Sequence, residues 1–169
     1  FITPKIIWQL CILMGSPEDG KREFEGGVIT KIVQGNYNCL YIGSVKEGVS
    51  ELNLTSGQVR NLLAIDESGE SIFCRDLLPY SDNELWIGTE SGIYIYNLRT
   101  AQFIHLRASL YDSYSLSDNA IYALYKDREE GLWIGSYFGG VDYYPRQYTY
   151  FAKYYPKNIE NSLHGKRVR

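Results

Sequence analysis

The sequence is poor in the residues that build metal sites and disulfide frameworks. It has two histidines and three cysteines in 169 residues. The cysteines, Cys11, Cys39 and Cys74, are odd in number and form no CxxC pair, which argues against a disulfide framework and against metal or redox chemistry. Two histidines are too few for a His-rich metal site. We therefore expect no metal and no cofactor.

The sequence also lacks a basic excess and a long apolar run. Seventeen Lys and Arg against twenty Asp and Glu give a formal net charge of −3. A nucleic-acid-binding domain would be basic, so we exclude nucleic acid as a partner. The apolar stretch 6–14 (IIWQLCILM) is shorter than the roughly 20 residues of a transmembrane helix. It is either a buried strand or part of a signal peptide, and one preceding lysine and the poor cleavage site at 15–17 favour the strand.

Aromatic residues, in contrast, are abundant, and some of them mark an internal repeat. The sixteen tyrosines favour strands. Three segments share one pattern: CLYIGS (39–44), ELWIGT (84–89) and GLWIGS (131–136). Their aromatic residues Tyr41, Trp86 and Trp133 are separated by 45 and 47 residues. A repeat of this length predicts a solenoid, a propeller or another array.

The match extends well beyond these motifs. Ile29, Cys74 and Ile121 stand twelve residues before the three aromatic residues. A fourth copy begins near the C-terminus, where Ser162-Leu163 and Val168 follow Ser115-Leu116 and Ile121 by 47 residues. The repeat is therefore a property of most of the chain.

Each unit contains about four short runs with alternating apolar residues, which indicates strands and not helices. In the third unit these are Ile121–Lys126, Leu132–Ser136, Gly140–Tyr144 and Tyr150–Tyr155. Four strands per period of about 45 residues is typical of a propeller blade. The predicted fold class is all-β: a partial β-propeller of about three four-stranded antiparallel blades of about 45–47 residues.

The predicted organisation follows the repeat. Residues 1–28 are a preceding blade remnant or an N-terminal segment, and 168–169 start a further blade. Between them lie blade A (29–73), blade B (74–120) and blade C (121–167). Three blades do not close a ring, since propellers usually have four to eight. The exposed edges would then pair with neighbouring blades or with another copy of the chain.

Residues that recur in every copy are expected to pack the blades. We therefore assign Trp86 and Trp133 to the core, although an aromatic face could also stack on a sugar. The motif glycines are expected to allow a close approach of backbones near the propeller axis.

The antiparallel order places the loops after the second and fourth strands of each blade on one face. That face is predicted to collect 136–139 and the link 107–119, with Asp118 among its polar groups. Aromatic residues that occur in one copy only are not explained by repeat packing, and an uncharged sugar needs aromatic planes beside polar groups. The tentative ligand-binding residues are Tyr137, Phe138, Tyr111, Tyr114 and Asp112. No catalytic constellation is found, and the scattered carboxylates are not at glycosidase spacing.

Two strings, NELWIGTESGIYIYN (83–97) and SLSDNAIYALYKDREEGLWIGSYFGGVDYY (115–144), resemble two-component regulator propeller repeats. These repeats belong to the periplasmic sensor regions of hybrid two-component system sensor histidine kinase/response regulators from gut bacteria. The first copy departs from the pattern, with Tyr41 in place of tryptophan. The resemblance implies a periplasmic propeller that senses glycan-derived oligosaccharides and signals to a kinase. No kinase element lies in this chain.

The leading hypothesis is thus a non-catalytic sensor fragment that binds an oligosaccharide. The alternative is a propeller scaffold for protein–protein interaction without a small ligand. An enzyme is disfavoured, because the loops lack convergent acids and histidines.

Overall fold

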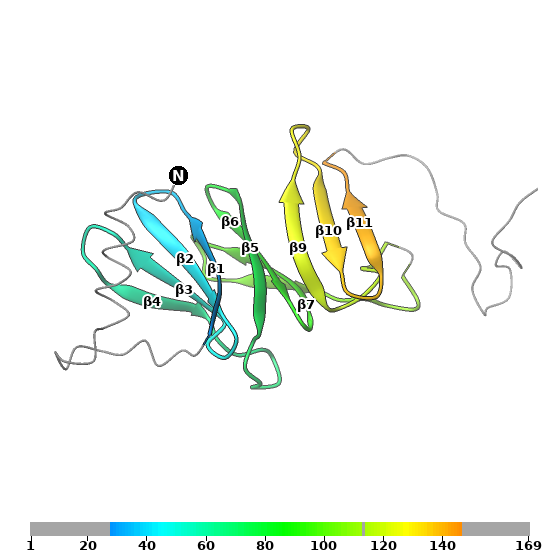
Figure 1. Ribbon diagram of the computed structural model, residues 1–169, viewed down its shortest axis with the longest axis horizontal. Helices are drawn as coiled ribbons and strands as arrows, with labels where there is room; N and C mark the ends of the chain where they lie inside the picture. Colours follow the sequence, from blue (N-terminus) through cyan, green and yellow to red (C-terminus); the bar gives the residue numbers. More distant parts are fainter. Residues whose placement is uncertain (1–27, 113, 147–169) are drawn as a thin grey trace, which may run out of the picture.

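A computed structural model describes residues 28–112 and 114–146 as three antiparallel sheets (Figure 1). The first sheet contains β1 (Ile29–Gln34), β2 (Cys39–Ser44), β3 (Val49–Asn53) and β4 (Val59–Leu63). The second contains β5 (Cys74–Ser81), β6 (Glu84–Thr89), β7 (Gly92–Asn97) and β8 (Phe103–Leu106). The third contains β9 (Ile121–Lys126), β10 (Leu132–Ser136) and β11 (Gly140–Tyr144). The predicted partial propeller is confirmed, with one sheet for each of blades A, B and C.

Neighbours along the chain pair in each sheet, which gives the up-and-down order that the repeat predicts. The three described strands of blade C have the predicted bounds. Its predicted fourth strand, 150–155, lies outside the described residues, as does the apolar stretch 6–14. No membrane-spanning helix is found within residues 28–112 and 114–146.

The hydrophobic core lies between the blades, because each sheet is apolar on the faces that meet its neighbours. Between blades A and B the cluster includes Tyr41, Val49, Cys74, Leu77 and Tyr94. Between blades B and C a second cluster includes Trp86, Ile93, Ile121, Leu132 and Ile134. A third cluster on blade A contains Leu40, Ile42, Leu52 and Leu54.

The motif glycines make room for a side chain of the next blade. A Cβ on Gly43 would lie 2.5 Å from Cys74 Sγ, and one on Gly88 would lie 2.9 Å from Ile121 Cγ2. Both distances are too short for a side chain other than hydrogen. We expected a close approach of backbones here, but the neighbour is a side chain, Cys74 or Ile121, the first residue of the first strand in the next blade.

A buried carboxylate joins all three blades. Asp76 on β5 accepts the backbone N–H of Leu124 in blade C at 2.8 Å and pairs with the Lys31 ammonium of blade A at 2.7 Å. It also accepts the N–H of Leu77 at 2.9 Å. Hydrogen bonds to a charged group are typically stronger than neutral ones. Asp76 therefore fixes the first strands of the three blades, β1, β5 and β9, relative to one another; we call these the inner strands.

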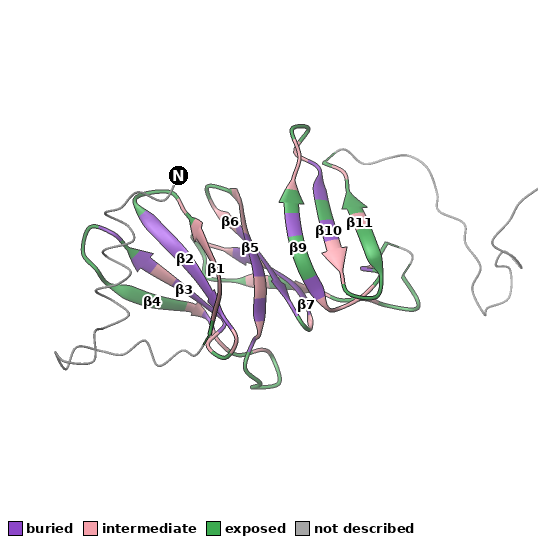
Figure 2. Cartoon of the chain, in the orientation of Figure 1, coloured by how far each residue is buried: buried purple, intermediate pink, exposed green. Residues whose placement is uncertain are grey.

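The expectation that Trp133 packs the core is wrong for the described residues. Trp86 has 4% of its surface exposed and Trp133 has 44%. Trp86 faces blade C, whereas no described blade covers the equivalent face of blade C. Figure 2 shows a related contrast, since β11 of blade C is exposed over most of its length and the equivalent strand of blade B, β7, is largely buried. Repetition therefore gives the direction in which Trp133 points, and the following neighbour determines its burial.

Candidate functional site

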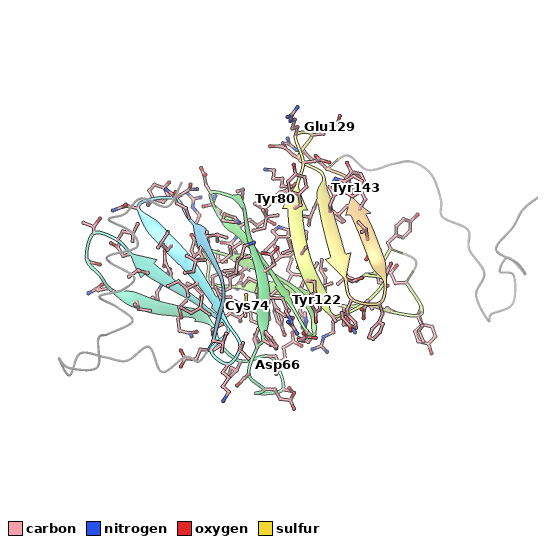
Figure 3. The ribbon with its side chains drawn as sticks, in the orientation of Figure 1. Asp66, Cys74, Tyr80, Tyr122, Glu129 and Tyr143 are labelled. Carbon is pink, nitrogen blue, oxygen red and sulfur yellow. The ribbon has the colours of Figure 1, made fainter. Side chains whose placement is uncertain are left out.

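The β10–β11 turn and the β8–β9 link lie together, as the strand order predicts. The N–H of Phe138 donates to Asp118 Oδ2 at 2.9 Å, and the N–H of Tyr137 donates to the Ala120 carbonyl at 2.9 Å. In Figure 3, Tyr122 and Asp66 lie at the lower ends of the blades, and Glu129 lies at the opposite end. The β10–β11 turn and the β8–β9 link therefore lie on the same face of the described blades.

Tyr137 and Phe138 extend from this face. Their side chains are 61% and 86% exposed. The two rings are 4.5 Å apart, centroid to centroid, and nearly perpendicular at 89°. Tyr122, at the start of β9, adds a third ring 5.3 Å from Tyr137. Exposed rings at these separations stabilise one another and still offer their outer faces to a ligand.

Two residues at the start of β5 extend this row: Phe73, which directly precedes the strand, and Arg75, and neither was predicted from the sequence. The Arg75 guanidinium lies 4.1 Å from the ring centroid of Phe73 and 4.4 Å from that of Tyr122, which are cation–π distances. Arg75 also forms an ion pair with Glu90. We call Phe73, Arg75, Tyr122, Tyr137 and Phe138 the aromatic ridge. It crosses the boundary between blades B and C.

The missed residues had weak signals in the sequence. Tyr122 directly follows Ile121, which the repeat assigns to the blade interior. Because successive side chains of a strand point to opposite faces, Tyr122 is expected on the other face of β9. Arg75 follows Cys74 in the same way. Their mutual contact could not be foreseen, because it joins two blades that are 47 residues apart in sequence.

The remaining predicted site residues belong to the β8–β9 link. Tyr111 and Tyr114 are exposed. Asp112 Oδ1 accepts the N–H of Tyr114 at 2.9 Å, and its backbone carbonyl accepts the Ser115 hydroxyl at 2.8 Å. The carboxylate of Asp112 thus stabilises its own turn, a usual role for an aspartate in a loop.

Asp118 organises the point at which the link meets the ridge. The hydrogen bond from the Phe138 amide, followed by bonds from the amides of Ala120, Asn119 and Gly139, lowers the pKa of the Asp118 carboxyl below its ordinary value. The group is therefore a carboxylate at neutral pH. Its hydrogen bond with the Phe138 amide holds the backbone of the β10–β11 turn, which carries Tyr137 and Phe138.

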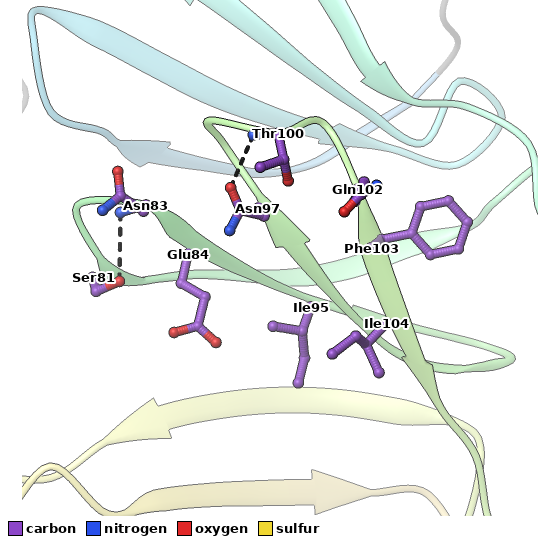
Figure 4. Close-up of a pocket in the computed structure, with 9 residues that line it drawn as sticks. All are labelled: Ser81, Asn83, Glu84, Ile95, Asn97, Thr100, Gln102, Phe103 and Ile104. Atoms are coloured by element: carbon purple, nitrogen blue, oxygen red, sulfur yellow. Dashed lines mark hydrogen bonds between the residues drawn. The ribbon is translucent and has the colours of Figure 1, made fainter.

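A separate cleft of about 460 Å³ lies on blade B, away from the ridge (Figure 4). It is lined by Ser81, Asn83, Glu84, Ile95, Asn97, Thr100, Gln102, Phe103 and Ile104. Glu84 is the one charged residue in this lining. The cleft contains none of the predicted site residues. Three or more His, Cys, Asp or Glu side chains that could hold a metal ion are not grouped anywhere in residues 28–112 and 114–146.

Comparisons with known proteins agree with this fold. No curated protein matches the sequence. The extracellular domain of a hybrid two component system of B. thetaiotaomicron is similar in structure, with a TM-score of 0.59 and 21% identity over 67% of this chain and 14% of that one. A second structure of the same protein's extracellular domain, there described as a one component system, gives 0.61 and 20%, over 69% and 15%. The chain thus spans about a seventh of the length of these two structures.

A third similar structure is the WD40 β-propeller domain of Doa1, with a TM-score of 0.50 and 14% identity over 71% of this chain and 37% of that one. These likenesses show the propeller fold. In addition, residues 115–138 match the family model described as "Two component regulator propeller", within the longer string that carried the resemblance. This segment is therefore similar to a two component regulator propeller repeat, and it lies within a partial β-propeller.

Proposed function

We propose that this chain is part of the extracytoplasmic sensor region of a two-component signalling receptor, and that it recognises a ligand without catalysing a reaction. The observation that carries the proposal is the family match at residues 115–138. The two similar structures from B. thetaiotaomicron, both of the extracellular domain of one signalling protein, support the same role. In a bacterium with two membranes, such a region lies in the periplasm.

The ligand that best fits the aromatic ridge is a neutral oligosaccharide. Tyr137 and Phe138 present exposed rings, and a sugar ring offers apolar faces that stack on such planes. Asp118 lies beside them, and because its oxygens already accept backbone amides, its proposed role is to hold the turn that carries the two rings. Arg75 is already paired with Glu90, which favours an uncharged ligand over an anion. Tyr111, Tyr114 and Asp112 of the neighbouring link are proposed as further contacts.

The test is a binding measurement with a defined set of probes. Neutral hexasaccharides from glucan, xylan, mannan and arabinan would be titrated calorimetrically into the chain. We expect the double change Tyr137→Ala with Phe138→Ala to weaken binding of the best probe about tenfold or more, which is about 1.4 kcal/mol. The change in stability should stay near 0.5 kcal/mol per exposed residue, which a melting curve would check.

Tyr37→Ala is the matched control, because Tyr37 is also an exposed tyrosine but lies in the β1–β2 turn, at the opposite end of the blades. It should leave binding unchanged. Unchanged affinity in the double variant would move the site away from the ridge. A melting temperature that collapses together with affinity would show that the two rings are structural anchors. If no probe binds, the carbohydrate proposal fails and a protein-binding scaffold becomes the better explanation.

A further inference from the structure

The glycine of the repeated motif has a different environment in blade C. In blades A and B the space above Gly43 and Gly88 is filled by Cys74 and Ile121, both fully buried. Above Gly135 the nearest atom is the Cβ of Ala123, 3.5 Å away and in the same blade. The third glycine therefore forms a socket that no described side chain enters.

The surface around this socket is apolar and exposed. Tyr125, Trp133 and Tyr143 are cross-strand neighbours on one face of the sheet, and Val141 lies beside Gly135 on the same face. We call Ala123, Tyr125, Trp133, Gly135, Val141 and Tyr143 the socket face. The equivalent face of blade B is buried in the cluster of Trp86 and Ile121.

The rings of the socket face are already ordered. The Trp133 indole N–H donates to Asp127 Oδ2 at 3.0 Å, and its ring lies 4.7 Å from that of Tyr143. A side chain fixed in this way loses little conformational entropy when a partner covers it. Exposed apolar patches of this kind mark interaction sites.

The repeat identifies the side chain that fits the socket. Gly88 and Ile121 are 33 residues apart, and so are Gly135 and Val168. Cys74, Ile121 and Val168 hold the same position in successive copies, and valine lies between cysteine and isoleucine in size. A β-branched apolar side chain at this position is also suited to a buried inner strand.

We propose that the socket face binds the inner strand of a further propeller blade, and that the Val168 side chain enters the space over Gly135. The partner is thus a segment of this chain, 162–169, together with the blade that it begins. The contact repeats the packing of Cys74 on Gly43 and of Ile121 on Gly88. It is independent of any ligand on the aromatic ridge.

Disulfide trapping in the 169-residue chain tests the proposal. The variant Gly135→Cys with Val168→Cys should form an intrachain disulfide under mild oxidation with oxidised glutathione, since Cα atoms about 4.4–6.8 Å apart can be bridged. Peptide mass mapping would identify the bridge among the natural cysteines. Gly88→Cys with Ile121→Cys is the positive control, because these positions already touch. Thr100→Cys with Val168→Cys is the negative control, since Thr100 is exposed on a distant turn.

We expect the 135–168 bridge in most molecules and the 100–168 bridge in few. A chain that forms the 88–121 bridge but not the 135–168 bridge would overturn the proposal, since the first bridge proves that the variant folds and can be oxidised. A 135–168 bridge found only between two molecules would also overturn it, because the occupant would then be a second copy. If the double variants unfold and form neither bridge, the single variants Val168→Cys and Thr100→Cys test the proposal instead. Iodoacetamide should label the thiol at position 168 more slowly than the thiol at position 100. Equal labelling of the two thiols would contradict the proposal.

Discussion

Trp86 and Trp133 hold the same place in two successive blades and have opposite surroundings. Trp86 is buried between β6 and blade C and lies 5.6 Å from the ring of Tyr80. Its indole nitrogen is buried and has no hydrogen-bond partner among the residues that the structure describes. Trp133 is half-exposed, and its indole N–H donates to Asp127. The same residue type is therefore an interior packing residue in one blade and a surface residue in the next.

The difference shows that a propeller blade does not have a complete core of its own. One half of the core comes from the following blade, as expected for repeat proteins in which nearest-neighbour interfaces supply much of the stability. A periodic tryptophan marks a position that faces a neighbour. The contribution of this tryptophan to the free energy of unfolding depends on whether that neighbour is present.

Truncation of the two tryptophans should give the largest contrast. Trp86→Ala is expected to lower the free energy of unfolding by about 3–5 kcal/mol, the usual cost of removing a buried tryptophan. Trp133→Ala in the same chain should cost less, about 2 kcal/mol, because only about half of its surface is in contact. Urea denaturation followed by circular dichroism would measure both. Equal losses would show that Trp133 is covered in solution and would remove the basis of the comparison.

A change at the paired glycines sharpens the comparison with a smaller effect. Gly88→Val forces a side chain into the space of Ile121 Cγ2 and should cost about 1–3 kcal/mol by overpacking. Gly135→Val meets no described side chain of another blade. It can disturb only the proposed Val168 contact at the end of the chain and should cost less, about 0.5 kcal/mol. Thermal melting of the two variants, with the unchanged chain as reference, gives the answer. A loss of stability for Gly135→Val as large as that for Gly88→Val would contradict the difference between the two glycines.

Acid should affect only one of the two indoles, and this is the smallest effect. The hydrogen bond from Trp133 is the main cause that lowers the pKa of the Asp127 carboxyl. Because the folded pKa lies below the unfolded value, the bond contributes stability above about pH 4 and is lost as the pH falls through the folded value.

The indole N–H resonances of a ¹⁵N-labelled chain would follow this titration. The Trp133 signal should move below about pH 4, and the Trp86 signal should stay until the chain unfolds. Asp127→Asn should abolish the movement of the Trp133 signal. A Trp133 signal that still titrates in that variant would contradict the assignment.

The sequence was sufficient to predict the blades because their signals are local and repeated. The alternation in β9, β10 and β11 predicted their bounds, and strand order alone placed the β10–β11 turn beside the β8–β9 link. The burial of Trp133 was predicted wrongly, because burial depends on a neighbour that the motif does not contain. The contacts of Arg75 with Phe73 and Tyr122 were missed, since they depend on the angle between two sheets.

The interlocking of one blade with the next also has a consequence for synthesis. A ribosome adds about 5–20 residues per second, and Trp86 precedes Ile121, which covers it, by 35 residues. The apolar face of blade B therefore waits roughly 2–7 s for its cover. During that interval a growing chain presents the kind of surface that blade C presents around Trp133. Such transient surfaces are prone to aggregate, so the speed of elongation and the protection of the emerging chain bear directly on the yield of folded protein.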